Sequence, residues 1–145
     1  MAGLVLAVAG CATAPVVTDP MAAKVRRLVD DTTHERREAQ AFASLEQLGP
    51  PAVPYIVGQL GDMRKLPIEQ IDLANHAPDA FESIRHYGPQ VVHDALAAIL
   101  NQVTGQHFGF VYNGATDAQR ADNRQQWVTW CVATYPAQAT TCRGM

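Results

Sequence analysis

Charged residues, aromatic residues and long hydrophobic runs are all scarce in this chain of 145 residues. Asp, Glu, Lys and Arg make up 17% of it, and the net charge is -3. Because nucleic acids are bound largely through a positive field of Lys and Arg, we expect no nucleic-acid partner. Hydrophobic residues still reach 48%, which suits a folded core rather than a disordered chain. The length fits a single domain.

Motifs of common enzyme classes are missing as well. No G-x-S-x-G motif, phosphate-binding P-loop or dinucleotide-binding glycine pattern occurs. The five histidines lack the H-x-x-x-H and H-E-x-x-H spacings that place two metal ligands on one helix face. We therefore expect no cofactor, no metal and no catalytic residues. The alternative is a metal-dependent enzyme or metal-binding factor that uses His76, His86, His93 and nearby carboxylates, with His86 and His93 as the best-placed pair.

The N-terminal residues 1–19 contain no Lys, Arg or His. The apolar run at residues 4–9 is too short to span a bilayer, so it is not a transmembrane helix. An apolar run followed by small residues is typical of the end of a secretory signal peptide. V-A-G-C at residues 8–11 resembles the bacterial lipobox, in which the cysteine is lipidated. The resemblance implies that residues 1–10 are a signal-peptide remnant and that Cys11 carries the lipid.

The lipobox resemblance also implies a place in the bacterial cell envelope. Residues 11–19 would form a lipidated tether to the membrane. Ala12 stands where an aspartate would resemble the inner-membrane retention signal, so the resemblance favours the periplasmic face of the outer membrane. A basic segment at the start is missing. Two alternatives therefore stay open: the signal peptide begins further upstream, or Cys11 matches the motif by chance.

Cys131 and Cys142 are the two cysteines left after lipidation. In an oxidising compartment such a pair suits one disulfide, which would hold the C-terminal tail to the last helix. The alternative is a buried Cys131 beside a free Cys142. Two cysteines alone cannot build a structural zinc site, and their spacing is not C-x-x-C.

Three sites carry helix-start signals. Asp19 suits the N-cap position and Pro20 the first helical position. Thr32 and Glu35 fit a capping box that would start a second helix, and residues 116–119, T-x-x-Q, fit another that would open the last helix.

Apolar residues at helical spacing place the helix interiors. The predicted helices cover residues 20–29, a stretch ending at Leu48, residues 51–60, residues 90–103 and a stretch from residue 117 to about Thr134. Prolines interrupt residues 63–89, where we expect one or two short helices.

Residues 38–62 resemble a HEAT-type repeat. An L-G-P-P turn at residues 48–51 separates two helices, and the second begins with A-V-P and ends with L-G-D. Gly88-Pro89 before another helix predicts a second, degenerate repeat. The resemblance implies an all-α fold over residues 20–135, a short right-handed stack of antiparallel helical hairpins, followed by a tail at residues 136–145.

An aromatic loop and a closing helix would end the stack, as in uncharacterised bacterial HEAT-repeat proteins, which this region resembles. Its rings form the candidate binding surface: Phe108, Phe110, Tyr112, Trp127 and Trp130. Clustered aromatics favour binding, but the end of a helical repeat also needs large rings to close its apolar face. Both interpretations stay open.

Repeat-like hairpins without a catalytic set predict a non-catalytic, membrane-anchored domain that binds a protein or peptide partner in the bacterial cell envelope. A purely structural envelope lipoprotein is a further alternative.

Overall fold

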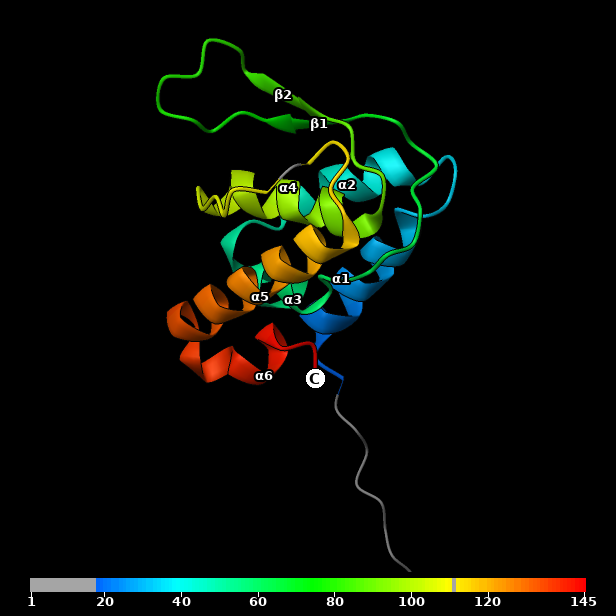
Figure 1. The fold of residues 1–145 in the computed structure, drawn as a ribbon. Helices are drawn as coiled ribbons and strands as arrows, with labels where there is room; N and C mark the ends of the chain where they lie inside the picture. Colours follow the sequence, from blue (N-terminus) through cyan, green and yellow to red (C-terminus); the bar gives the residue numbers. More distant parts are fainter. Residues whose placement is uncertain (1–17, 111) are drawn as a thin grey trace, which may run out of the picture.

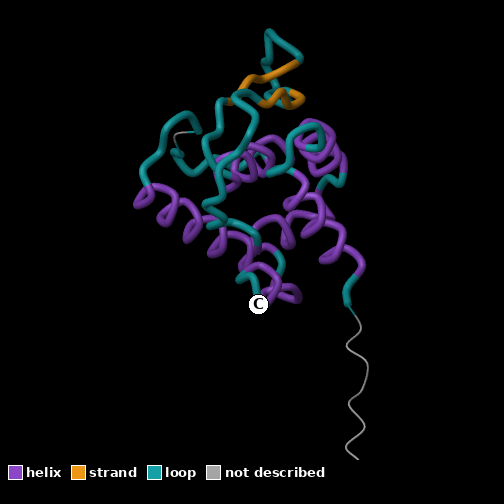
Figure 2. Tube along the Cα trace, turned by 90° about the vertical axis from the view of Figure 1, so that its right-hand side faces the viewer, coloured by secondary structure: helices purple, strands orange, loops and turns teal. Residues whose placement is uncertain are grey.

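Six α-helices and one two-stranded antiparallel sheet make up the residues that the computed structural model describes, 18–110 and 112–145. In chain order the elements are α1 Pro20–Asp31, α2 Glu38–Gln47, the 3-10 turn η1 Pro50–Ala52, α3 Val53–Gly58, β1 Ile71–Ala74, β2 Ile84–Tyr87, α4 Val92–Thr104, α5 Asp117–Thr134, the 3-10 turn η2 Pro136–Gln138 and α6 Ala139–Cys142. The hairpin of β1 and β2 projects beyond the helices in two perpendicular views (Figure 1, Figure 2). The prediction of an all-α stack of helical hairpins is therefore wrong.

Helix α1 begins as the sequence predicts. The Asp19 side chain accepts hydrogen bonds from Met21 N at 2.8 Å and Ala22 N at 3.4 Å, and Pro20 is the first helical residue. Asp19 also accepts a hydrogen bond from the hydroxyl of Tyr55 on α3 at 2.5 Å. The Tyr55 hydroxyl is the main reason why the pKa of Asp19 is lowered. The helix cap thus also ties α1 to α3.

The capping box predicted at Thr32 and Glu35 is wrong. Thr32 lies at the end of α1, fully buried, and its hydroxyl donates to the carbonyl of Val29 at 2.6 Å. A turn follows in which Arg36 has a positive φ of 75°, and α2 starts only at Glu38. A threonine hydroxyl can donate to a carbonyl one turn back as well as cap a new helix. Here the Thr32 hydroxyl donates to the carbonyl of Val29, so it has a hydrogen-bond partner inside the core.

Gly49 separates α2 from α3. Its φ of 63° lies in the left-handed region that favours glycine, and Pro50 then begins η1. The helix predicted over residues 51–60 forms as η1 followed by α3. The apolar residues predicted to face the core on this segment are all buried: Val53, Ile56, Val57 and Leu60.

Helix α3 is the centre of the helical part. It packs against α1, α4, α5 and α6, whereas α2 packs mainly against α1, α4 and β1. The HEAT-type resemblance of residues 38–62 implied that α2 and α3 pack chiefly on each other. Both helices and their turn exist, but they do not form the main packing unit.

Residues 63–89, where short helices were expected, contain the antiparallel sheet instead. Ile71 pairs with Tyr87, and Leu73 pairs with Arg85. Ile71, Leu73 and Tyr87 are buried, and β1 contacts both α2 and α4. The sheet therefore covers one side of these two helices with β1 while most of β2 stays exposed (Figure 1).

Helix α4 is the most buried element. Residues 91–100 are all buried, because α4 lies among α2, α3 and β1. It ends at Gly105, whose φ of 70° is left-handed as expected. A strand rather than a helix precedes Gly88, so the predicted second repeat is wrong. The capping box that opens α5 is confirmed: Thr116 Oγ1 accepts from Gln119 N at 3.2 Å, and Gln119 Oε1 accepts from Thr116 N at 2.8 Å.

Residues 136–145, predicted to be a tail, hold η2 and α6. A disulfide joins Cys131 of α5 to Cys142 of α6, and both cysteines are fully buried. Helix α6 also packs on α3 so closely that a Cβ on Gly58 would collide with the carbonyl of Thr141. The C-terminal segment is therefore anchored to the helical part through Cys142 and the packing of α6 on α3, while most of its residues lie at the surface.

Candidate functional site

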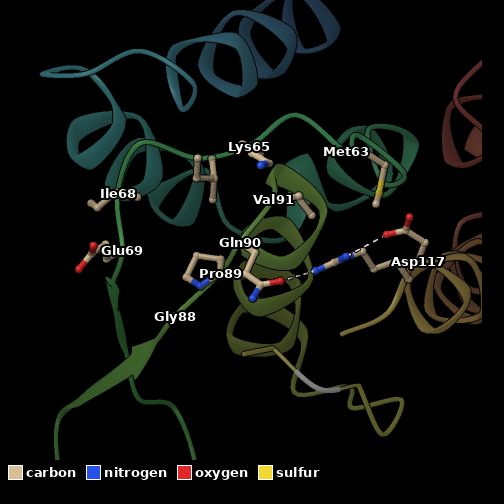
Figure 3. A pocket seen from close by; sticks show the side chains of 11 residues that line it. Met63, Lys65, Ile68, Glu69, Gly88, Pro89, Gln90, Val91 and Asp117 are labelled. Atoms are coloured by element: carbon tan, nitrogen blue, oxygen red, sulfur yellow. Dashed lines mark hydrogen bonds and ion pairs between the residues drawn. The ribbon is translucent and has the colours of Figure 1, made fainter. Parts of the chain in front are cut away.

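A cleft of about 730 Å³ opens between two extended segments and the start of α5 (Figure 3). Charges of both signs lie at its edge, on the exposed side chains of Lys65, Glu69 and Asp117. The apolar side chains in its walls are Met63, Leu66, Ile68, Pro89 and Val91. Apolar walls with a few polar groups are typical of ligand-binding clefts.

The cleft forms where an antiparallel ribbon is interrupted. Lys65 pairs with Val91, and β1 pairs with β2 further along, but between these points residues 66–70 face only residues 88–90. The backbone N–H of Gly88 donates to the side chain of Asn113 at 2.8 Å rather than across the ribbon. The next residue, Pro89, has no N–H to donate. The two segments therefore separate and leave a space between them.

A buried ion pair forms the base of the cleft. Asp94 of α4 accepts from Arg120 of α5 through both carboxylate oxygens, at 2.8 Å to Nε and 3.0 Å to Nη2. The side chains are 0% and 7% exposed. The same carboxylate accepts from the backbone N–H groups of Gln90 and Val91 at 3.0 and 3.3 Å. One carboxylate thus fixes a wall of the cleft to two helices.

Two further acceptors complete the surroundings of Arg120. Its Nη2 donates to Gln90 Oε1 at 3.2 Å, and its Nη1 donates to Asp117 Oδ1 at 3.1 Å (Figure 3). Hydrogen bonds from Arg120 to Asp94 are the main reason why the pKa of the guanidinium is raised. The group stays charged and cannot exchange a proton in the neutral range. It therefore holds the cleft in shape rather than acting as an acid or a base.

A second polar cluster lies beside this ion pair in the core. His93 is fully buried; its Nδ1 accepts from the backbone N–H of Gly61 at 3.0 Å, and its Nε2 lies 3.2 Å from Asn123 Oδ1. The ring of Phe110 packs edge-on against His93 at 5.3 Å between centroids. Burial is the main reason why the pKa of His93 is lowered, so the imidazole is neutral near pH 7.

The three histidines of the metal hypothesis have separate partners. His86 is exposed on β2 and lies 2.7 Å from Asp72 across the hairpin, while the exposed His76 lies 4.0 Å from Glu46. His93 has both ring nitrogens occupied in the core. Within residues 18–110 and 112–145, no three His, Cys, Asp or Glu side chains are grouped so that they could hold a metal ion. The structure does not bring these histidines to one site.

The predicted aromatic surface divides into two parts. Phe110 and Trp127 are buried at 7% and 1% exposure, so these two rings belong to the core. Phe108, Trp130 and Tyr112 are partly exposed and pack against it. Burial raises the pKa of Tyr112 to about 12. Core closure therefore describes Phe110 and Trp127, while a binding role for the partly exposed rings stays a prediction.

Phe108 and Trp130 line a shallow apolar groove on α5 of about 350 Å³. Both rings stand nearly perpendicular to Trp127, at 4.7 and 5.5 Å between centroids. Edge-to-face contacts of this kind stabilise aromatic clusters. Trp127 therefore fixes the orientation of the two rings that form the groove.

The predicted lipidation site, Cys11, and residues 1–17 lie outside the described residues, as does Val111 of the aromatic loop. Among the helices described, none combines the length and the hydropathy needed to cross a bilayer. The signal peptide, the lipid anchor and the envelope location stay predictions.

No protein-family model, curated protein or solved structure matches the chain significantly. Arg120 and Asn123 were not predicted from the sequence, and Asp94 was considered only as one of the carboxylates near His86 and His93 in the metal hypothesis. Their partners lie 26 to 30 residues away, so no local spacing identifies them.

Proposed function

We propose that this chain is a non-catalytic binding domain of the bacterial cell envelope, tethered to the membrane through lipidated Cys11, whose cleft takes an extended peptide segment of a partner protein. The observation that carries the proposal is the cleft itself. It has apolar walls, charges of both signs at the edge, and a base fixed by Asp94 and Arg120.

The shape and the rigidity of the cleft support a peptide as its occupant. Both long walls are non-helical backbone, residues 63–69 and 88–91, and the space between them can take a further stretch of chain. The side chains of Met63 and Ile68 offer contact surface for apolar side chains of such a peptide. A base that is already ordered loses little conformational entropy on binding, which favours affinity.

The charges of the cleft support binding rather than catalysis. Arg120 is neutralised by Asp94 and makes a second ion pair with Asp117. A general base must be able to reach the proton that it removes and must titrate near the working pH. The raised pKa of Arg120 and its four hydrogen bonds fit neither requirement.

Site-specific crosslinking tests the proposal. A photoreactive residue at position 68 in the full-length protein, expressed in a bacterial host, should form an adduct with a discrete envelope protein. The same residue in place of the exposed Lys24 on α1 is the control, and it should not form that adduct. Mass spectrometry should locate the adduct in one segment of the partner. Equal adducts from both positions, or none from position 68, would contradict the proposal.

A peptide made from that segment allows a direct measurement of affinity. Met63→Asp, at the cleft, should weaken binding about tenfold or more, because a charge replaces an apolar contact. The matched control is Met145→Asp, since Met145 is also an exposed methionine but does not line the cleft. The lipid anchor is tested separately: Cys11 should incorporate a labelled fatty acid, and Cys11→Ala should not.

A further inference from the structure

A buried side-chain amide on α5 has a donor group without a partner. Asn123 is 2% exposed, and its Nδ2 makes no hydrogen bond among the described residues. Leaving such a donor buried and unpaired destabilises a protein, so an arrangement of this kind needs an explanation. An acceptor supplied by a ligand is one explanation that the surroundings support.

The orientation of this amide follows from its neighbours. The N–H of Gly61 can only donate, so His93 Nδ1 must be the acceptor and the ring proton must be on Nε2. His93 Nε2–H therefore donates to Asn123 Oδ1. The Nδ2 group then points away from His93. The N–H of Gly61 thus fixes the orientation of the His93 ring, and the ring fixes the orientation of the Asn123 amide. The donor group of that amide therefore lies on the side facing away from His93.

Asn123 lines a small cavity of about 60 Å³ between α5 and the aromatic loop. This volume corresponds to about two water molecules, which leaves room for a single hydroxymethyl or carbonyl group. The cavity adjoins the apolar groove, because Phe108 and Gln126 line both. Trp130 lies one turn further along α5. Together the two spaces form one continuous surface, which we call the α5 face.

We propose that the α5 face binds a neutral saccharide. A sugar ring would lie against Trp130 and Phe108 through its C–H groups. One of its oxygens would enter the small cavity, where a shift of the lining side chains would uncover Asn123 Nδ2, closed off from solvent in the free chain, so that it donates a hydrogen bond to that oxygen. This site shares no lining residue with the cleft of the peptide proposal, so the two proposals are independent.

The other side chains of the α5 face favour a saccharide over a peptide or a charged ligand. Amides and a hydroxyl dominate its polar positions, from Gln119, Gln125, Gln126 and Thr129, and Asp122 is the one charged lining residue. Amide groups donate and accept, as sugar hydroxyls do. Within the part of the chain that the structure describes, no Lys or Arg lines the face to pair with a phosphate or a carboxylate. Large aromatic rings offer rigid apolar area at low entropy cost.

Nuclear magnetic resonance of the full-length protein tests the proposal with two probes, maltotriose and triacetylchitotriose. Binding of either one should shift two assigned signals together and saturably, the side-chain amide of Asn123 and the indole N–H of Trp130. Absence of a saturable shift with both probes at about 10 mM would overturn the proposal. A stronger effect from an uncharged tripeptide would overturn it as well, since it would identify the α5 face as a peptide site.

Variants separate a binding role from a structural one. Trp130→Ala removes a partly exposed ring and should lower saccharide affinity about tenfold or more. Met63→Ala, at the cleft, should leave it unchanged. Because Asn123→Ala also removes the partner of His93, that variant can unfold, and the wild-type amide signal is the more direct test. Equal affinities of wild type and Trp130→Ala would overturn the proposal.

Discussion

Asp94 of α4 and Arg120 of α5 form an ion pair in which both side chains are buried. Two hydrogen bonds of 2.8 and 3.0 Å join them. Removing one partner of a buried pair leaves an uncompensated charge, which costs far more than the loss of an exposed pair. Because Asp94 also accepts from two backbone N–H groups of the cleft wall, this one carboxylate links the stability of the fold to the shape of the cleft.

The first prediction concerns that carboxylate. Asp94→Ala should lower the free energy of unfolding by about 3–5 kcal/mol, measured by urea denaturation, because Arg120 is left buried without a counter-charge. Asp117→Ala is the control, since the Asp117 side chain is 85% exposed and its ion pair with Arg120 is worth less than about 1 kcal/mol. Similar losses in both variants would contradict a special role for Asp94.

The second prediction concerns pH. The pKa of His93 is below 6.5 in the folded state, so the unfolded chain takes up a proton first as the pH falls below 6.5. Unfolding is then favoured, and the free energy of unfolding should fall by up to about 1.4 kcal/mol per pH unit as the pH drops below about 6.5. His93→Gln should flatten this slope, whereas His34→Gln, at an exposed position, should keep it. An unchanged slope in His93→Gln would contradict the assignment.

The third prediction concerns the disulfide. Cys131 and Cys142 are 11 residues apart, so their bond closes a short loop and should contribute about 2–3 kcal/mol. The double variant Cys131→Ala, Cys142→Ala should therefore unfold at a temperature lower by about 5–15 °C. Adding a reductant should lower the wild-type midpoint but not that of the variant. If the reductant lowered the midpoint of the wild type and of the double variant equally, its effect would not come from the bond between Cys131 and Cys142.

Local signals explain which parts of the fold could be predicted. The caps at Asp19 and Thr116 need only a side chain and a backbone within three residues, and both formed as predicted. Thr32 carries the same kind of signal, yet its hydroxyl donates backwards to Val29 because the residue is buried at the end of α1. Burial is decided by distant residues, so the sequence pattern alone could not choose between the two.

The hairpin and the polar core depend on contacts that local patterns do not contain. Burial alternates along β1, but only over four residues, and β2 has a single buried residue, Tyr87. An alternation of about four residues is the shortest that indicates a strand, and Ile68, Ile71 and Leu73 also suit one turn of a helix, so the sequence pattern did not distinguish the two. Asn123 could not be predicted because its partner, His93, is 30 residues away, beyond any local pattern. Phe108 and Trp130 of the α5 face were among the five aromatic residues predicted as a binding surface, because their clustering is visible along the chain, whereas the burial of Phe110 and Trp127 is not.

The last prediction compares two apolar residues of the hairpin region. Leu73 is 1% exposed on β1, and Leu73→Ala should lower the free energy of unfolding by about 2–5 kcal/mol through the cavity that it leaves. Phe81, between the strands, is fully exposed, so Phe81→Ala should change that free energy by less than about 0.5 kcal/mol. Urea denaturation of both variants measures the difference. Equal losses in the two variants would contradict the placement of Leu73 in the core and Phe81 at the surface.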